Sequence, residues 1–337
     1  MHAGNMEKLA IIIPAFKADF LRETLQSIAR QSDKRFSLYI GDDASPHDLL
    51  EIIRPFVNEI DLRYHRFETN LGGTDLVAHW NRCIELSEGE EWIWLFSDDD
   101  VMDRSCVAAF YKYVEAHGET VGDLLHFDLE VINEHGDRIW PVIPFGHCID
   151  YTEFVTRRIG GNLHSTGVEY IFRRKRWEEV GGFESFDLAW CSDDATWIKL
   201  SENGGIQTIP DTRVKWRFSD RNISSKHANA AIIRRKVDAS VAYVHWLRNY
   251  FERRRLRDRP SLYRTAQWVM TVPLNATALA AKTKVRYATH VASSLGLKGI
   301  WRVWLVVHAT YRTLKIGLAS IVKAYGDRIG RDDDADR

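Results

Sequence analysis

The first hundred residues alternate continuous apolar runs with segments whose apolar residues recur at helical spacing. The runs of strand length are Leu9 to Ile13, Phe36 to Ile40, Leu62 to Phe67 and Trp92 to Phe96. Helical spacing is seen over residues 21–28 and 75–86. Strands that alternate with helices predict an α/β fold with a mainly parallel, Rossmann-like sheet that has helices on both faces. In such sheets the ligand lies beyond the carboxyl ends of the strands, so the residues that follow each run are the first candidates for a site.

The pattern continues less regularly to about residue 225. It predicts a strand over Leu124 to Ile132, a loop over residues 160–167 and a strand over 168–174 that runs into a helix. A helix is expected over Thr196 to Ser201, followed by a loop through Gly204 and Gly205.

Beyond Ala228 the pattern becomes helical, with breaks near Pro260 and Pro273. On a helix over residues 300–325, one arc is basic and the other side is apolar. The basic arc holds Arg302, His308, Arg312, Lys315 and Lys323, and the apolar side holds Val303, Val307, Leu314, Leu318 and Ile321. Two hypotheses stay open for this helix: it lies in a membrane interface, or it packs its apolar side onto the α/β domain.

Composition places the chain among globular proteins, since 45% of its 337 residues are hydrophobic and 28% are charged. Its length predicts one large domain with an appendage, or two domains. Four cysteines without paired short spacing favour a reducing compartment. The apolar run before Pro14 is too short for a signal peptide, and no run reaches the roughly 18 residues of a membrane span. We therefore expect a cytoplasmic protein.

Charge is distributed unevenly along the chain. Residues 1–225 carry a formal charge of −15, residues 226–330 carry +16, and the tail 331–337 carries −2. A basic, Trp-rich segment is attracted to polyanions or to anionic lipid. Because no nucleic-acid-binding module is recognisable, we expect no nucleic acid among the partners.

Three clusters of aspartates follow predicted strands or loops along the chain. These clusters are Asp42 and Asp43, Asp98 to Asp100, and Asp193 with Asp194. Neighbouring carboxylates raise each other's pKa unless a cation joins them, and oxygen ligands of this kind suit Mg²⁺ or Mn²⁺. The alternative is that these residues only cap helices and turns, where Asp is common.

Eight short motifs follow one another along the chain: IIIPAFK, IGDDASPHD, NLGGT, HWNRCIE, FSDDDV, VGGFESF, CSDDATWIKL and KWRFSDRNIS. In this order and spacing they resemble the family 2 glycosyltransferases of GT-A fold. The resemblance implies a GT-A domain over residues 1–225, with a nucleotide-sugar half over about 1–103 and an acceptor half over about 104–225. A basic helical extension over 226–330 and the acidic tail 331–337 follow. The implied activity is the inverting transfer of a hexosyl or deoxyhexosyl group from a nucleoside-diphosphate sugar to an acceptor hydroxyl, with Mn²⁺ or Mg²⁺.

The resemblance also implies roles for the residues that bind the donor. Pro14 and Ala15 would line the nucleotide, and Asp43 would face the base with Asp42 supporting it. Asp98 would lie beside the ribose.

Further residues are assigned by the same resemblance to the metal and to the reaction. Asp99 would hold the metal, and His227 would add a ligand. Asp194 would act as the general base beside Asp193. The diphosphate would be bound by two arginines, Arg217 and Arg221, because the guanidinium fork matches phosphate oxygens.

Family analogy indicates a role in surface polysaccharide or lipopolysaccharide assembly, with a glycan or a lipid-linked saccharide as acceptor. The protein would then be peripheral on the inner face of the cytoplasmic membrane. One alternative is a sugar-nucleotide-binding protein without turnover, because Ser97 stands where the usual motif has its first acid. Another is a metal-dependent phosphohydrolase that uses the three adjacent aspartates.

Overall fold

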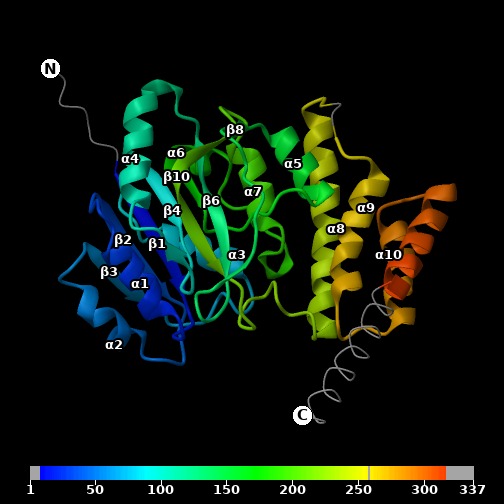
Figure 1. Cartoon of the computed structure of the whole chain (residues 1–337), viewed down its shortest axis with the longest axis horizontal. Coiled ribbons are helices and arrows are strands. Elements are labelled where there is room, and N and C mark those ends of the chain that lie inside the picture. The colour runs from blue at the N-terminus through cyan, green and yellow to red at the C-terminus, as the bar shows by residue number, and fades with distance from the viewer. Residues whose placement is uncertain (1–7, 257–258, 316–337) are drawn as a thin grey trace, which may run out of the picture. The chain divides into compact units, whose positions relative to one another are not determined.

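The computed structural model describes residues 8–256 and 259–315. These residues form two compact units, one ending at Ser225 and the other beginning at Lys226 (Figure 1).

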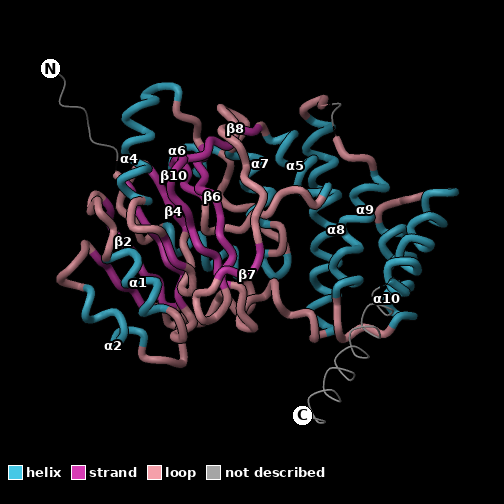
Figure 2. Tube along the Cα trace, viewed as in Figure 1, coloured by secondary structure: helices cyan, strands magenta, loops and turns pink. Residues whose placement is uncertain are grey.

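The first unit is built on one mixed sheet (Figure 2). Its strands are β1 (Leu9–Ala15), β2 (Phe36–Asp42), β3 (Leu62–Arg66), β4 (Trp92–Leu95), β5 (Val101–Met102), β6 (Leu124–Ile132), β7 (Arg138–Trp140), β8 (Cys148–Ile149), β9 (Tyr170–Arg173) and β10 (Ile206–Arg217). Their order is β3-β2-β1-β4-β9-β6-β10-β5, with β7 beside β6 and β8 beside β10. Pairing is parallel from β3 to β4 and between β6 and β10, whereas β9 is antiparallel to both of its neighbours.

Seven α-helices are described in this unit. They are α1 (Leu21–Ala29), α2 (Leu49–Ile53), α3 (Leu76–Ile84), α4 (Cys106–His117), α5 (Tyr151–Gly160), α6 (Arg174–Glu179) and α7 (Ser192–Leu200). The buried faces of α1, α2 and α4 share one hydrophobic core with alternate residues of β1, β2, β4 and β6. Within this core the rings of Trp94 and Phe127 stack at 5.1 Å. Burial of these side chains fixes the strands whose carboxyl ends carry the aspartates.

The α/β architecture expected from the sequence is confirmed, and three details differ. The sheet is mainly parallel only in its first half, because β9 inserts antiparallel between β4 and β6. Strand β10 begins at Ile206, directly after the predicted loop, and was not anticipated. Helix α7 begins at Ser192, four residues before the predicted helix, so Asp193 and Asp194 lie in its first turn.

The second unit is helical, as its sequence predicts. It contains α8 (Ala230–Arg253), α9 (Leu262–Asn275) and α10 (Ala281–Ser294), and residues 299–315 are also helical. Helix α9 packs against both α8 and α10, and Pro273 lies in its last turn. None of the described helices is both long enough and apolar enough to cross a bilayer.

The helix over residues 299–315 exposes a stripe of large apolar side chains. The stripe consists of Ile300, Val303, Trp304, Val307, Tyr311 and Leu314, all about half exposed or more. On the opposite side Leu305 and Ala309 are fully buried. The predicted continuation to residue 325, with Leu318, Ile321 and Lys323, and the tail 331–337 lie outside the described residues.

Candidate active site

The carboxyl ends of β1 and β2 lie side by side and bring the first predicted residues together. Ala15 pairs with Asp42 in the parallel register, and Asp43 N donates to Ala15 O at 2.9 Å. The Ser45 hydroxyl donates to Phe16 O at 2.7 Å and ties the loop after β2 to the loop after β1. Pro14 and Ala15 therefore line the same edge as the first aspartate pair.

Asp42 is completely buried and its carboxylate is fully engaged by protein donors. One oxygen accepts from Ser45 N at 2.7 Å, and the other accepts from the Tyr64 hydroxyl and from Arg66, each at 2.6 Å. These contacts fix the loop after β2 and link it to β3. Asp42 is thus a structural part of the loop that carries Asp43.

Asp43 organises the NLGGT turn. Its two oxygens accept from Leu71 N and Gly72 N, each at 2.8 Å, and Arg82 forms an ion pair with the same carboxylate. A Cβ atom at Gly72 would lie 2.7 Å from an oxygen of Asp43, so any other residue here would displace this carboxylate. The turn is thereby held beside the end of β1.

The aspartates after β4 meet a cation from the loop after β1. Asp98 Oδ2 accepts from Phe16 N at 2.9 Å and from Lys17 N at 2.7 Å. The Lys17 ammonium lies 3.1 Å from Asp98 Oδ1 and also forms an ion pair with Asp99, which accepts from the Ser97 hydroxyl as well. Burial alone would lower the pKa of Lys17, but the two carboxylates outweigh it and hold the pKa above its usual range. Lys17 is therefore charged.

Asp99 is the carboxylate predicted to hold a metal ion, and its oxygens contact Lys17 and Ser97 in the structure. Among the described residues, no three His, Cys, Asp or Glu side chains converge into a metal-binding group. A hard divalent cation is commonly held by one or two carboxylates together with substrate phosphates and water. The donor set therefore fits Mg²⁺ or Mn²⁺ shared between Asp99 and a diphosphate, at a carboxylate that Lys17 also contacts.

Arg217, at the end of β10, is completely buried and makes hydrogen bonds through both its backbone and its guanidinium. Its backbone N donates to Asp100 Oδ1 at 2.6 Å, and its guanidinium donates to Asp99 O, Asn133 O and Glu23 at 2.6–2.9 Å. Burial and the Asp99 charge raise the pKa of Asp100 well above its usual range. In this arrangement Arg217 braces the strand ends, and nothing in its contacts supports a role at the diphosphate.

Arg221, near the end of the predicted GT-A domain, and His227, just beyond it, differ in their surroundings. Arg221 is exposed and makes only long ion pairs, at 3.5 Å to Asp19 and 3.6 Å to Asp220. Its guanidinium is therefore accessible to a ligand. His227 belongs to the second unit, where its carbonyl oxygen accepts from Thr277 N at 3.0 Å. Its assignment to a metal stays a prediction.

The aspartate pair at the start of α7 is asymmetric. Arg158 Nε lies 2.9 and 3.2 Å from the two oxygens of Asp194, which is almost completely buried. Asp193 accepts from Asp194 N at 2.9 Å and is only half-buried. Burial and the adjacent Asp194 charge raise the pKa of Asp193 to about 7, although Arg158 opposes the rise. One carboxylate is thus held by a cation and the other titrates near neutrality.

Sequence reasoning missed two cations that complete these clusters. Lys17 lies inside the IIIPAFK motif, so its position after a strand was a usable signal. Arg158 lies in α5, which was not predicted, and no local pattern relates it to Asp194. Trp197 follows the aspartate pair on α7, but it is completely buried and stacks on Tyr170 at 4.4 Å.

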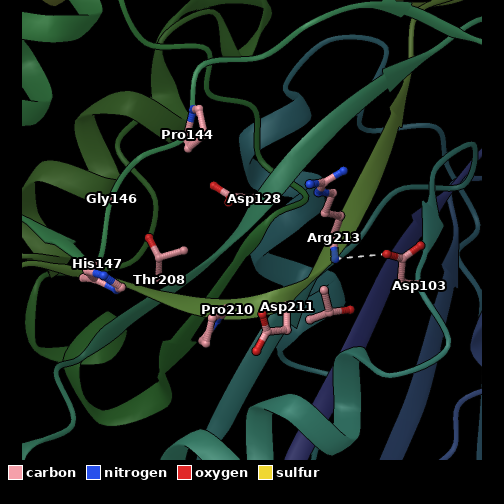
Figure 3. A pocket seen from close by; sticks show the side chains of 10 residues that line it. Asp103, Asp128, Pro144, Gly146, His147, Thr208, Pro210, Asp211 and Arg213 are labelled. Carbon is pink, nitrogen blue, oxygen red and sulfur yellow. Dashed lines mark hydrogen bonds between the residues drawn. The ribbon is translucent and has the colours of Figure 1, made fainter.

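A separate cavity of about 470 Å³ lies beside the irregular part of β10 (Figure 3). The register of β10 against β6 shifts between Ile209 and Arg213, and the cavity opens at this shift. Asp128 and His147 line it together with Asp211 and Arg213, and none of the predicted site residues does. It is therefore distinct from the cluster at the strand ends.

Comparison with known families decides what kind of protein carries this arrangement. The model of the family described as glycosyl transferase family 2 matches residues 10–181, which is just over half of the chain. The chain belongs to glycosyl transferase family 2. The matched region of this family 2 member contains the strand-end aspartates, Lys17 and Arg158.

Curated relatives of this family 2 chain are distant. The poly(ribitol-phosphate) β-N-acetylglucosaminyltransferase TarS of Staphylococcus aureus is 25% identical over 134 residues, which are 39% of this chain and 22% of TarS. The match thus spans only about a fifth of that relative. The putative teichuronic acid biosynthesis glycosyltransferase TuaG of Bacillus subtilis is 24% identical over 239 residues, covering 66% of this chain and 84% of TuaG.

Solved structures support the GT-A fold for this family 2 chain. Residues 1–349 of S. aureus TarS in complex with UDP-GlcNAc superpose with a TM-score of 0.55 at 15% identity, covering 93% of this chain and 92% of that one. The mannosyltransferase PcManGT from Pyrobaculum calidifontis, in complex with GDP-Man and Mn²⁺, gives a TM-score of 0.50 at 15% identity, covering 91% of this chain and 87% of that one. At such identity the likeness concerns the fold alone.

Proposed function

We propose that this family 2 glycosyltransferase moves a sugar from a nucleoside-diphosphate sugar to an acceptor hydroxyl with inversion of the anomeric centre. The observation that carries the proposal is the carboxylate pair at the start of α7, where Asp193 has a pKa of about 7 beside the arginine-bound Asp194. A general base works best when its pKa lies near the working pH. This asymmetric pair gives the site one base and one fixed charge.

The donor would bind at the carboxyl ends of β1, β2 and β4. Pro14, Ala15 and Asp43 would line the nucleotide, and Asp99 would share Mn²⁺ or Mg²⁺ with the diphosphate. Support comes from the convergence of these residues and from the nucleotide sugars bound to TarS and PcManGT, together with the Mn²⁺ of PcManGT. When bound, the ion would stabilise negative charge on the leaving diphosphate. Arg221, whose guanidinium is exposed, would assist it.

In the reaction, the acceptor oxygen would attack the anomeric carbon while the bond to the diphosphate breaks. The attack would come from the face opposite the leaving group, which accounts for inversion. A carboxylate on that face would take the acceptor proton. The family resemblance gives this task to Asp194, but Arg158 already occupies both of its oxygens. We assign the base to Asp193, whose pKa is raised by burial and by the charge of Asp194.

The acceptor would be a glycan or a lipid-linked saccharide in surface polysaccharide or lipopolysaccharide assembly, with a hexose or deoxyhexose as the transferred sugar. TarS and TuaG are named for poly(ribitol-phosphate) and teichuronic acid, which supports a polymer of the cell surface.

An anionic membrane surface is the second partner that we propose. The apolar stripe of the helix over residues 299–315 is exposed, and Arg312 and Lys315 are exposed on the same helix. An in-plane helix of this kind buries apolar side chains at the headgroup boundary while its cations contact anionic lipid. The protein would then work peripherally on the inner face of the cytoplasmic membrane.

A thermal-shift screen of nucleotide sugars, with and without Mn²⁺, tests the donor proposal. The cognate donor should raise the melting temperature, because a ligand that binds only the native state stabilises it. Asp99→Asn should lose the part of the shift that depends on Mn²⁺. Donor binding without transfer to any acceptor would favour the non-catalytic alternative, and phosphate release without acceptor would favour the phosphohydrolase.

A further inference from the structure

Lys17 places a fixed positive charge at the carboxylate that is proposed to hold the metal. Its backbone N donates to Asp98 at 2.7 Å, and its ammonium contacts both Asp98 and Asp99. The residue is held at its backbone N and at its ammonium, and only 26% of its side-chain surface is exposed. It is therefore a built part of the cluster and not a surface lysine that happens to approach it.

Two adjacent buried carboxylates need a counter-ion. The side chains of Asp98 and Asp99 are 4% and 2% exposed, so water screens their mutual repulsion poorly. The ammonium of Lys17 supplies one positive charge between them. A divalent cation at the same oxygens would meet this ammonium at close range, and the two positive charges would repel each other.

We propose that Lys17 is the resident counter-ion of the Asp98–Asp99 pair and keeps free divalent cations off Asp99 until the donor diphosphate arrives. The diphosphate is itself negatively charged, so the Lys17 ammonium can move from Asp99 to a diphosphate oxygen. The metal ion then binds Asp99 in place of the ammonium. Metal and donor would then bind together and not one after the other. This inference rests on the metal role of Asp99 in the proposed function.

The test measures binding of Mn²⁺ alone to the full-length protein, by the loss of the free Mn²⁺ signal in electron paramagnetic resonance. Lys17→Gln removes the charge at similar length, and it should bind Mn²⁺ about tenfold more tightly than the parent, or more, since a unit charge at this range is worth at least that factor. Lys17→Arg keeps the charge and should bind as weakly as the parent. Lys112→Gln removes the same charge from an exposed position on α4 and should change nothing.

A second measurement covers the case in which Lys17→Gln is unstable. Its melting temperature should fall without Mn²⁺, because two buried carboxylates lose their counter-ion, and it should recover with Mn²⁺. Equal Mn²⁺ affinity in the parent and in Lys17→Gln would overturn the inference, as would a melting temperature that Mn²⁺ does not restore.

Adding Asp99→Asn to Lys17→Gln should abolish the gain in affinity. A gain that survives would place the ion elsewhere and also overturn the inference. None of these measurements uses a donor or turnover. Failure of every nucleotide sugar in the thermal-shift screen would therefore count against the proposed function and leave the result for Lys17 intact.

Discussion

Two neighbouring aspartates of identical chemistry acquire different properties from one arginine. Arg158 binds Asp194, whereas burial and the adjacent Asp194 charge raise the pKa of the half-buried Asp193 to about 7. Asp193→Asn should therefore lower kcat by about 10²- to 10⁴-fold, the usual contribution of a positioned base. Donor affinity, measured by calorimetry, should stay close to that of the parent.

The pH dependence of the same step follows from the raised pKa of Asp193. A carboxyl group with a pKa of about 7 is protonated below that pH and cannot accept the acceptor proton. The rate should therefore fall as the pH drops through about 7 and level off above it. A normal rate in Asp193→Asn, with loss of turnover in Asp194→Asn, would return the base to Asp194.

Arg158 offers a separate test, because its charge lowers the pKa of Asp193. Arg158→Gln should move the midpoint of the pH–rate profile to higher pH, since the opposing positive charge is gone. Arg157→Gln is a matched control in the adjacent position of α5, because Arg157 bonds to Phe145 O and Glu153 instead. If the midpoint moves equally in both variants, a general change in α5 is responsible, and not the loss of the Arg158 charge beside Asp194.

Among the structural elements, β10 is braced at its end by one completely buried side chain. Arg217 joins β10 to the loop after β4 and to Glu23 of α1. Arg217→Met should lower the free energy of unfolding by about 2–4 kcal/mol, because several buried hydrogen-bond acceptors lose their donor. Urea denaturation should show this loss, whereas Arg221→Met, at an exposed position, should change stability by less than about 0.5 kcal/mol. Equal effects of the two substitutions would contradict the bracing role.

How far the sequence predicts this fold depends on the kind of signal that each element carries. The strands β1, β2 and β4 are buried on both faces and therefore appear as continuous apolar runs. Strand β10 contains Pro210 and Asp211 at a register shift and charged residues beyond it, so neither a continuous nor an alternating apolar pattern marks it. Its existence follows from pairing with β6, which no local pattern records.

The same distinction applies to the site. The sequence locates its aspartates because they follow recognisable strands or motifs. Their partners are distant along the chain: Lys17 is 82 residues from Asp99, and Arg158 is 36 residues from Asp194. These contacts decide which carboxylate is free to act, and only the folded chain reveals them.

At the scale of the whole molecule, charge and exposed apolar surface point to the same partner. Residues 226–330, which belong to the second unit, carry a formal charge of +16. The same unit carries the exposed apolar stripe around Val307. Anionic vesicles should therefore co-sediment the full-length protein at low salt. Salt should weaken the binding, because screening acts beyond about 8 Å at physiological ionic strength.

Val307→Asp should reduce this co-sedimentation, because it places a charge in the apolar stripe. Thr271→Asp adds the same charge at an exposed position of α9 and should leave most of the binding intact. If the parent stays in the supernatant with anionic vesicles at low salt, the membrane proposal is wrong.

The antiparallel strand β9 has a consequence for how the first unit can move. It hydrogen-bonds to β4 on one side and to β6 on the other, so the two halves of the unit, residues 1–103 and 104–225 in the sequence prediction, share one uninterrupted sheet. A hinge between the halves would have to break these ladders, and rearrangement during turnover is therefore left to the loops. Amide hydrogen exchange should show β4 and β9 opening together, at the free energy of global unfolding, while residues 218–229 exchange much faster. Earlier exchange at β9 than at β4 would show that the two halves can separate.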